Sequence, residues 1–128
     1  MPETKPHVLL VEDDADLRIA LAVLLRHDGF QVSMAEDALG ALAIAVRQLP
    51  DLIVLDLGLP GGGGFSVMER MSHTRAASVP ILILTASNDE THRDKALQMG
   101  AAGYLRKPME TGELLAAVRR FAGKEAAA

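Results

Sequence analysis

The stretch Leu52-Ile53-Val54-Leu55-Asp56, followed directly by Leu57-Gly58-Leu59-Pro60, decides the fold of this chain. Four apolar residues in a row, with glycine and proline soon after, are typical of a short strand buried on both faces of a parallel sheet. Asp56 then stands at the carboxyl end of a buried strand. Open α/β sheets bind their ligands at this edge, so Asp56 is the first candidate for a functional residue.

Apolar runs like this one alternate with helix-period segments along the rest of the chain. Four further strands are expected, at His7–Val11, around Val32 and Met34, at Ile81–Thr85 and at Gly103–Arg106. Because strands and helices alternate, we expect parallel βαβ units with right-handed crossovers. The predicted fold class is therefore α/β, with a doubly wound (βα)5 sheet of five parallel strands.

Helices are expected after each strand, where apolar residues recur at three- and four-residue spacing. Glycine and proline provide the stops, at Asp28-Gly29, Pro50 and Gly100. Gly61–Gly64 is expected to form a loop before the third helix. The apolar residues that mark the five helices are, in order, Leu17, Leu21, Leu24 and Leu25; Leu39, Leu42, Val46 and Leu49; Phe65, Met68 and Met71; Ala96 and Leu97; Leu114, Val118 and Phe121.

Composition restricts the classes of function. The chain has 128 residues, 49% of them hydrophobic and 23% charged, which suits one compact globular domain. A net charge of −4 argues against direct nucleic-acid binding, and the absence of cysteine excludes disulfides and thiolate metal sites. No apolar stretch approaches the ~20 residues that span a membrane, and no signal peptide is visible, so a cytoplasmic protein is expected.

Polar residues end four of the expected strands. The run Glu12-Asp13-Asp14, the lone Asp56, Thr85 and Lys107 should all reach the same edge of the sheet. Mg²⁺ prefers carboxylate oxygens, while an ammonium group and a hydroxyl can each meet a phosphate oxygen. Phosphoryl transfer needs little beyond such positioning and charge neutralisation. The combination therefore suits metal-assisted phosphoryl transfer to a carboxylate.

Each of these features has a plainer interpretation when it is taken alone. Asp14 or Asp16 can cap the first helix, and Asp56 can cap a turn. Lys107 can be a solvated lysine, and Thr85 an ordinary β-branched strand residue. Their conjunction at one edge is what favours a phosphoryl-transfer site. The histidines lack a metal-binding spacing and are expected at the surface; they are His7, His27, His73 and His92.

Four stretches in this order resemble the receiver domain of two-component response regulators, over about Lys5 to Gly123. They are Val8–Asp14 (VLLVEDD), Asp51–Gly61 (DLIVLDLGLPG), Pro80–Ala86 (PILILTA) and Gly100–Pro108 (GAAGYLRKP). The resemblance implies a flavodoxin-like sheet with strand order 2-1-3-4-5. It divides the chain into an N-terminal extension (1–6), a receiver domain (7–123) and a C-terminal tail or linker start (124–128).

The resemblance also assigns roles at the predicted edge. Asp56 would be the phosphoacceptor, served by a histidine kinase or a histidine phosphotransfer domain. Mg²⁺, or Mn²⁺ in its place, would bind Asp13 directly, Glu12 through water, the Asp56 carboxylate and the Gly58 backbone carbonyl. Such a domain accepts phosphate and slowly releases it, and it is not expected to be an enzyme acting on another substrate.

Four further residues carry the response to phosphorylation in this resemblance. Thr85 and Tyr104 match the switch pair, and Lys107 matches the lysine that contacts the phosphoryl group. Pro108 would follow Lys107 through a cis peptide bond. A C-terminal output domain or a separate downstream protein would receive the signal, and one sequence leaves that choice, like the cognate kinase, open.

The chain departs from the family pattern at several positions. The loop Gly61–Gly64 lacks a common acid and is expected to be unusually mobile. Met109 replaces a common phenylalanine. Gly58 and Ser87 stand where larger side chains often tune hydrolysis of the aspartyl phosphate, so the phosphoryl lifetime stays open.

Departures on a second surface concern assembly. Winged-helix regulators with similar receivers dimerise through charged pairs on the face of the fourth helix, fifth strand and fifth helix. Here Ala102, Gly103 and Ala117 stand where charged residues are expected. A monomer, or a weak dimer after activation, is therefore predicted.

Three other functions share parts of this pattern. A flavodoxin-like FMN binder would need a Ser/Thr/Gly phosphate loop where this chain has the Glu12 run. A haloacid-dehalogenase-type, aspartate-dependent phosphatase would need a second acid at the position of Gly58. A pseudo-receiver docking module would not need the intact set of polar residues. The receiver interpretation accounts for more of the residues than any of these.

Overall fold

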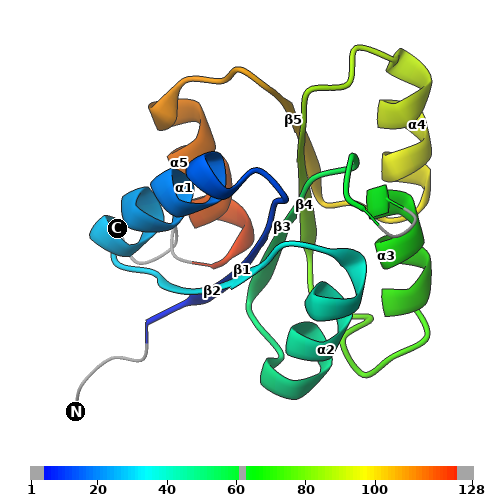
Figure 1. The fold of residues 1–128 in the computed structure, drawn as a ribbon, viewed down its shortest axis with the longest axis horizontal. Coiled ribbons are helices and arrows are strands. Elements are labelled where there is room, and N and C mark those ends of the chain that lie inside the picture. The colour runs from blue at the N-terminus through cyan, green and yellow to red at the C-terminus, as the bar shows by residue number, and fades with distance from the viewer. Residues whose placement is uncertain (1–4, 61–62, 124–128) are drawn as a thin grey trace.

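The computed structural model describes residues 5–60 and 63–123, and it shows a parallel sheet between two layers of helices (Figure 1). The strands are β1 (His7–Val11), β2 (Gln31–Ala35), β3 (Leu52–Leu55), β4 (Ile81–Thr85) and β5 (Gly103–Arg106). The helices are α1 (Ala15–His27), α2 (Ala38–Gln48), α3 (Gly63–Met71), α4 (Glu90–Gln98) and α5 (Thr111–Phe121). The predicted extension and tail include residues 1–4 and 124–128, which lie outside the described residues.

All strand pairs are parallel, and the order β2-β1-β3-β4-β5 confirms the predicted doubly wound sheet. The chain moves from β1 outward to β2 and then returns to place β3 on the other side of β1. In this register Val11 lies beside Leu55. The residues that follow them, Glu12 and Asp56, therefore leave adjacent strands at the topological switch point, where such sheets bind ligands.

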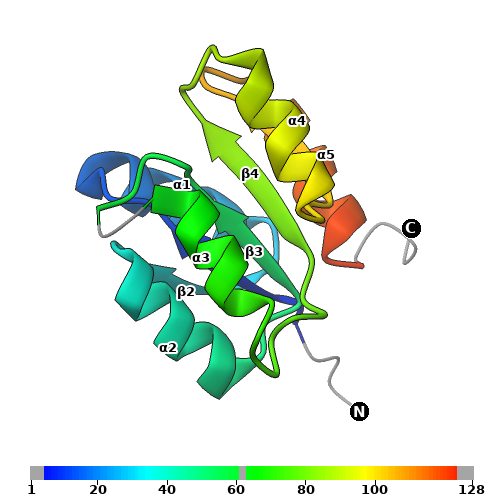
Figure 2. The ribbon, with the colours of Figure 1, turned by 90° about the vertical axis from the view of Figure 1, so that its right-hand side faces the viewer.

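The two faces of the sheet are covered by different helices. Helices α1 and α5 pack on one face, and α2, α3 and α4 pack on the other (Figures 1 and 2). Within β1, Leu9 and Val11 face one layer, while Val8 and Leu10 face the other. All residues of β3 and β4 are buried as well, which explains their uninterrupted apolar sequences. None of the helices in the described part of the chain could cross a bilayer.

Helix α2 buries a face that only part of its predicted apolar residues share. Its fully buried residues are Ala38, Ala41 and Ala45, and Leu42 packs against the same core, whereas Leu39 is 75% exposed. Leu49 lies past the helix as its C-cap, with a φ of 47°. The apolar spacing therefore predicted the helix and one of its core contacts, Leu42, but not that alanines occupy the most buried positions.

The ends of the helices follow local chemistry. Asp14, rather than Asp16, caps α1 and accepts a hydrogen bond from the backbone N–H of Leu17 at 3.2 Å. Gly29 and Gly100 have φ values of 95° and 99°, in the left-handed region that favours glycine at a helix end.

Helix α3 begins at Gly63, two residues before the predicted start at Phe65. The expected mobility of Gly61 and Gly62 falls outside the described residues. A Cβ atom at Gly64 would lie 2.7 Å from the carbonyl oxygen of Asp56, so this position has no space for a side chain. The glycine therefore lets the start of α3 lie directly against the backbone that carries the candidate phosphoacceptor.

Glycine is needed for packing at position 103 too. A Cβ atom there would lie 2.7 Å from the ring of Phe121 and 3.0 Å from Leu82. The last turn of α5 thus packs on β5 where a side chain would otherwise stand. Arg119 of α5 also makes a bidentate ion pair with Asp28, and its Nε lies 2.8 Å from Asp28 Oδ2. Together these contacts attach α5 to the sheet and to the end of α1.

Candidate functional site

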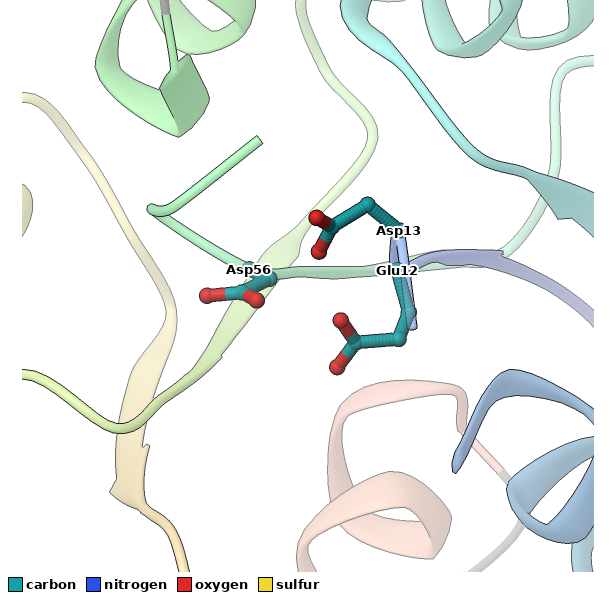
Figure 3. A group of neighbouring side chains, drawn as sticks. All are labelled: Glu12, Asp13 and Asp56. Atoms are coloured by element: carbon teal, nitrogen blue, oxygen red, sulfur yellow. The ribbon is translucent and has the colours of Figure 1, made fainter. Parts of the chain in front are cut away.

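Three carboxylates meet at the carboxyl edge of the sheet. Glu12 and Asp13 follow β1, Asp56 follows β3, and one oxygen of each lies within 4.8 Å of the others. Figure 3 shows the carboxylates of Glu12 and Asp13 on the same side of the chain, both directed toward Asp56. Such a group of hard oxygen ligands could hold a divalent cation such as Mg²⁺.

The main chain holds these acids in place. The backbone N–H of Glu12 donates to the carbonyl of Ala35, and that of Asp56 donates to the carbonyl of Val11, each at 3.1 Å. Both bonds continue the pairing of the sheet beyond its last strand residues. The backbones of Glu12 and Asp56 are therefore positioned by the sheet, with little freedom to move away from each other.

Glu12 is the most deeply buried of the three, with an exposed fraction of 3%. Burial raises the pKa of its carboxyl group, and the hydrogen bond from Lys107 offsets this only in part. The backbone N–H of Asp14 also donates to Glu12 Oε2, at 3.3 Å. The ion pair with Lys107 thus stabilises the charged form of Glu12 at this buried position.

Lys107 contacts two of the acids at once. Its ammonium group donates to Glu12 Oε1 and lies 3.3 Å from Asp56 Oδ2. Burial acts to lower the pKa of Lys107, but its contacts with Glu12 and Asp56 outweigh burial and raise the pKa overall. Lys107 therefore carries a positive charge at the centre of the acid group, where it can also meet an incoming anion.

Thr85 and Pro108 border the same site. Thr85 ends β4 with an exposed fraction of 3%, and its carbonyl accepts a hydrogen bond from the backbone N–H of Lys107 at 2.8 Å. The peptide bond between Lys107 and Pro108 is cis. β4 and β5 therefore deliver the hydroxyl and the ammonium group to the edge where β1 and β3 deliver the acids.

Tyr104 lies on β5, and its hydroxyl is buried without a hydrogen-bond partner among the described residues. Burial raises the pKa of this hydroxyl. Ser87 lies near it but outside hydrogen-bond geometry. A buried hydroxyl without a partner destabilises the fold, so a conformation that gives the Tyr104 hydroxyl a hydrogen-bond partner would be favoured.

Gly58 leaves one side of Asp56 uncovered. Its backbone N–H donates to Asp56 Oδ1 at 3.1 Å. A Cβ atom at this position would lie 3.7 and 3.9 Å from the two Asp56 oxygens and within 4 Å of no other residue that the structure describes beyond its chain neighbours, so a side chain would fit among the described residues. The predicted role of the Gly58 carbonyl as a metal ligand stays a prediction.

Sequence reasoning missed two residues near the site. The guanidinium group of Arg18 donates to the backbone carbonyl of Glu12 at 2.8 Å and so supports the acid loop from α1. Arg18 stands six residues after Glu12, in the first turns of the helix that follows the acid run, and this position is the only sequence signal that could have indicated its role. His92, expected at the surface, is only partly exposed and contacts Ser87. No sequence signal indicated that contact.

Comparison with known proteins agrees with this geometry. The family model of the response regulator receiver domain matches residues 8–119. This chain belongs to that family. The receiver domain of non-phosphorylated HemR from Leptospira biflexa has 35% sequence identity and a TM-score of 0.85, with 92% of this chain and 94% of that chain covered.

Two further similar proteins bear on the site and on the chain's length. The receiver domain of the sensor histidine kinase PA1611 from Pseudomonas aeruginosa PAO1, solved with a magnesium ion in its active site cleft, is 32% identical with a TM-score of 0.85, covering 94% of this chain and 99% of that one. The KDP operon transcriptional regulatory protein KdpE of Escherichia coli K12 is 41% identical over 88% of this chain but only 49% of its own length. The chain thus spans about half the length of the curated relatives it matches.

The ion pair of Lys107 generates a pH-dependent prediction. At pH 7, Lys107→Met should lower the free energy of unfolding by about 3 kcal/mol, because a buried Glu12 charge loses its partner. Removing the ammonium group moves the folded-state pKa of Glu12 further above its ordinary value of 4.5. A carboxyl group whose pKa is raised in the folded state loses stability as the pH rises from its unfolded-state pKa to its folded-state pKa, because only the unfolded chain ionises freely in that range. The deficit should therefore be small below pH 4.5, grow as the pH rises above that value, and level off above the raised pKa.

Urea unfolding of both proteins between pH 4 and pH 8 measures this difference. Lys5→Met, which removes an exposed lysine, is the matched control and should cost little at any pH. A deficit of equal size across the whole pH range would show that Lys107 stabilises the fold through packing rather than through Glu12.

Proposed function

We propose that this domain accepts a phosphoryl group on Asp56 from a histidine kinase or a histidine phosphotransfer domain, with Mg²⁺ as cofactor, and changes conformation as a result. The observation that carries the proposal is one cluster: Glu12, Asp13 and Asp56 lie within 4.8 Å of one another, with Lys107 in contact with two of them. Membership of the receiver family supports the same role.

The chemistry follows from the positions of these groups. An oxygen of Asp56 bonds to phosphorus as the phosphorus–nitrogen bond of a phosphohistidine breaks, and the electron pair of that bond stays on the imidazole nitrogen. Lys107, 3.3 Å from Asp56 Oδ2, can turn its ammonium group toward a phosphoryl oxygen. Catalysis then consists of positioning and charge neutralisation, which suits a site made of fixed charges.

A divalent cation fits the donor set of the site. Carboxylate oxygens are the ligands that Mg²⁺ prefers, and Mn²⁺ accepts the same ligands. Glu12, Asp13, Asp56 and the Gly58 carbonyl would hold the ion. When bound, the cation neutralises phosphoryl oxygens and the repulsion among the acids. The magnesium ion in the similar PA1611 receiver domain supports this part of the proposal.

Thr85 and Tyr104 are the proposed switch. The buried Tyr104 hydroxyl has no hydrogen-bond partner in the described residues, and the Thr85 hydroxyl stands at the end of the neighbouring strand. A phosphoryl group that draws Thr85 toward Asp56 would change the space around Tyr104. The phosphoryl group then shifts the equilibrium through contacts that exist in only one of the two states.

The output of the domain is proposed from its relatives. Several relatives are transcriptional regulators of about twice this length, so the signal would pass to a DNA-binding output domain or to a separate partner. The domain itself would bind no nucleic acid, would act on no other substrate, and would be a monomer or a weak activated dimer. Because histidine kinases draw phosphate from ATP, the role implies a cytoplasmic location.

The phosphoacceptor can be identified by mass. Incubation with acetyl phosphate and Mg²⁺ should add one acid-stable, base-labile phosphoryl group to the protein, and Asp56→Ala should add none, because the nucleophile is gone. Intact-protein mass spectrometry measures both. Asp94→Asn, which changes an exposed acid of α4, is the matched control and should label normally. Normal labelling of Asp56→Ala would refute the assignment.

The metal site can be tested without phosphorylation. Asp13→Asn should weaken Mg²⁺ binding by roughly tenfold or more, since one of the clustered charges that attract the ion is lost. An NMR titration that follows the amide signals around Asp56 gives the affinity. Asp16→Asn alters a nearby exposed acid outside the cluster and should leave the affinity within about twofold. Equal affinities for the two variants would place the ion elsewhere.

The switch can be separated from phosphate acceptance. Thr85→Ala should still take a phosphoryl group on Asp56 but should respond weakly, because the hydroxyl contact that favours the second state is missing. NMR shifts of Tyr104 and of the start of α4, with and without beryllium fluoride, report the response. Thr91→Ala, on an exposed residue of α4, serves as the comparison. A full response in Thr85→Ala would contradict the proposed coupling.

A further inference from the structure

Asp13 is the one acid of the cluster that the sheet does not hold. Glu12 and Asp56 are bonded to neighbouring strands through their backbone N–H groups, and Glu12 is buried, whereas Asp13 is exposed. No packing keeps the Asp13 carboxylate beside two others among the described residues, and repulsion between like charges favours turning it outward. A contact from outside the sheet is therefore needed to keep Asp13 directed toward Asp56 before a cation arrives.

Arg18 of α1 provides that contact. Its Nη1 atom donates to the carbonyl oxygen of Glu12 at 2.8 Å and to the carbonyl oxygen of Asp13 at 3.5 Å. Within the described part of the chain, Asp13 makes no other hydrogen bond. Side chains of a helix lean toward its N-terminus, so an arginine in the first turns of α1 reaches back to the loop that precedes the helix.

The two carbonyl groups determine the direction of the Asp13 side chain. The Glu12 carbonyl belongs to the peptide plane before Asp13, and the Asp13 carbonyl belongs to the plane after it. Because each peptide unit is planar, the two planes together set φ and ψ of Asp13 and hence the direction of its Cα–Cβ bond. The guanidinium group thus holds the backbone in the conformation that directs Asp13 toward Asp56 (Figure 3).

The charge of Arg18 by itself opposes a cation at this site. The Arg18 side chain is 15% exposed, and its Nη2 atom lies 3.6 Å from the carboxylate of Glu36. Glu36 is 70% exposed and so offsets the positive charge only in part. An arginine that acted through its charge alone would lower the affinity for Mg²⁺, whereas an arginine that positions Asp13 raises it. The two roles therefore predict opposite effects when Arg18 is replaced.

We propose that Arg18 is a positioning residue for the divalent cation, because it holds the backbone of Glu12 and Asp13 so that the Asp13 carboxylate faces Asp56 before the ion binds. The inference rests on the proposed function, in which these three acids hold Mg²⁺. A ligand that is already in place binds more tightly, since its conformational entropy has been lost before binding. Arg18 acts through the backbone of the acid loop.

A Mg²⁺ titration of Arg18→Met measures the effect without a phosphodonor. Methionine keeps the apolar stem of the side chain and removes its N–H donors. The variant should bind Mg²⁺ about three- to tenfold more weakly than the wild type, which is the scale of freeing part of the backbone of one residue. NMR shifts of the amides around Asp56 give both affinities. Unchanged or tighter binding would overturn the inference and leave the proposed function intact, whereas absence of Mg²⁺ binding in the wild type would overturn both.

Arg26→Met is the matched control. Arg26 lies on the same helix, and its Nη2 atom also donates to a backbone carbonyl, that of Val32, at 3.1 Å. This variant loses the same charge and the same kind of hydrogen bond away from the acid cluster, so its Mg²⁺ affinity should stay within about twofold of the wild type. An equal loss of affinity in both variants would overturn the inference, because a general loosening of α1 would then explain it.

Labelling by acetyl phosphate separates cation binding from the later chemistry. The Mg²⁺ concentration that gives half of the maximal labelling rate should rise about three- to tenfold in Arg18→Met, in line with the titration. The rate at saturating Mg²⁺ should stay within about twofold, since the bound ion then holds Asp13 itself. A lower maximal rate with an unchanged half-saturating concentration would overturn the inference, because Arg18 would then act after the cation has bound.

The metal-free wild type provides a test that does not depend on how well a variant folds. Nitrogen-15 relaxation should show the Asp13 amide to be as rigid as the amides of β1, with an order parameter of about 0.85. The Arg18 side-chain N–H groups should be equally ordered, because they are bonded to the same loop. An Asp13 order parameter below about 0.6 in the metal-free protein would show that the acid is not held in place, and would overturn the inference.

Discussion

Coverage of a parallel sheet on both faces is the constraint from which the rest of this structure follows. Leu9 and Val11 face one helical layer while Val8 and Leu10 face the other, so the buried part of β1, from Val8 to Val11, has no position for a polar side chain. Parallel strands need crossover helices, and those helices supply the cover. The first place where a central strand can carry charge is the residue after its end, and all strand ends meet at one edge. Glu12 and Asp56 occupy these places.

That arrangement brings together carboxylates that repel one another, and the ammonium group of Lys107 offsets this repulsion. A buried ion pair is weak support for a fold, because desolvation opposes the attraction between the charges. Here it serves to keep Glu12 ionised at an exposed fraction of 3%. The same ammonium group lies beside Asp56, so the contact that makes the acid cluster tolerable also places a cation where an anion would arrive. The stability of the acid cluster and the positive charge beside Asp56 therefore depend on one side chain.

The sequence predicted the elements and the edge because both depend on local patterns. Runs such as Leu52–Leu55 and stops such as Gly29 and Gly100 act over a few residues, and the family resemblance placed the polar residues in chain order. Packing was harder to predict. The burial of Ala38, Ala41 and Ala45, while Leu39 and Leu49 are exposed, depends on the distance between α2 and the sheet. The early start of α3 depends on the fit of Gly64 against Asp56, and the contact between Ser87 and His92 depends on a side-chain rotamer.

These differences in predictability reflect how firmly each part of the site is held. Glu12 and Asp56 continue the hydrogen bonding of the sheet through Ala35 and Val11, so their backbone positions change only if the sheet changes. Gly58, by contrast, has space for a side chain beside Asp56, and His92 is 41% exposed. Substitution at the latter positions costs little packing energy. The fold thus fixes the positions of the polar residues at the strand ends and leaves space for variation at Gly58 and at the exposed start of α4, where a change does not disturb the core.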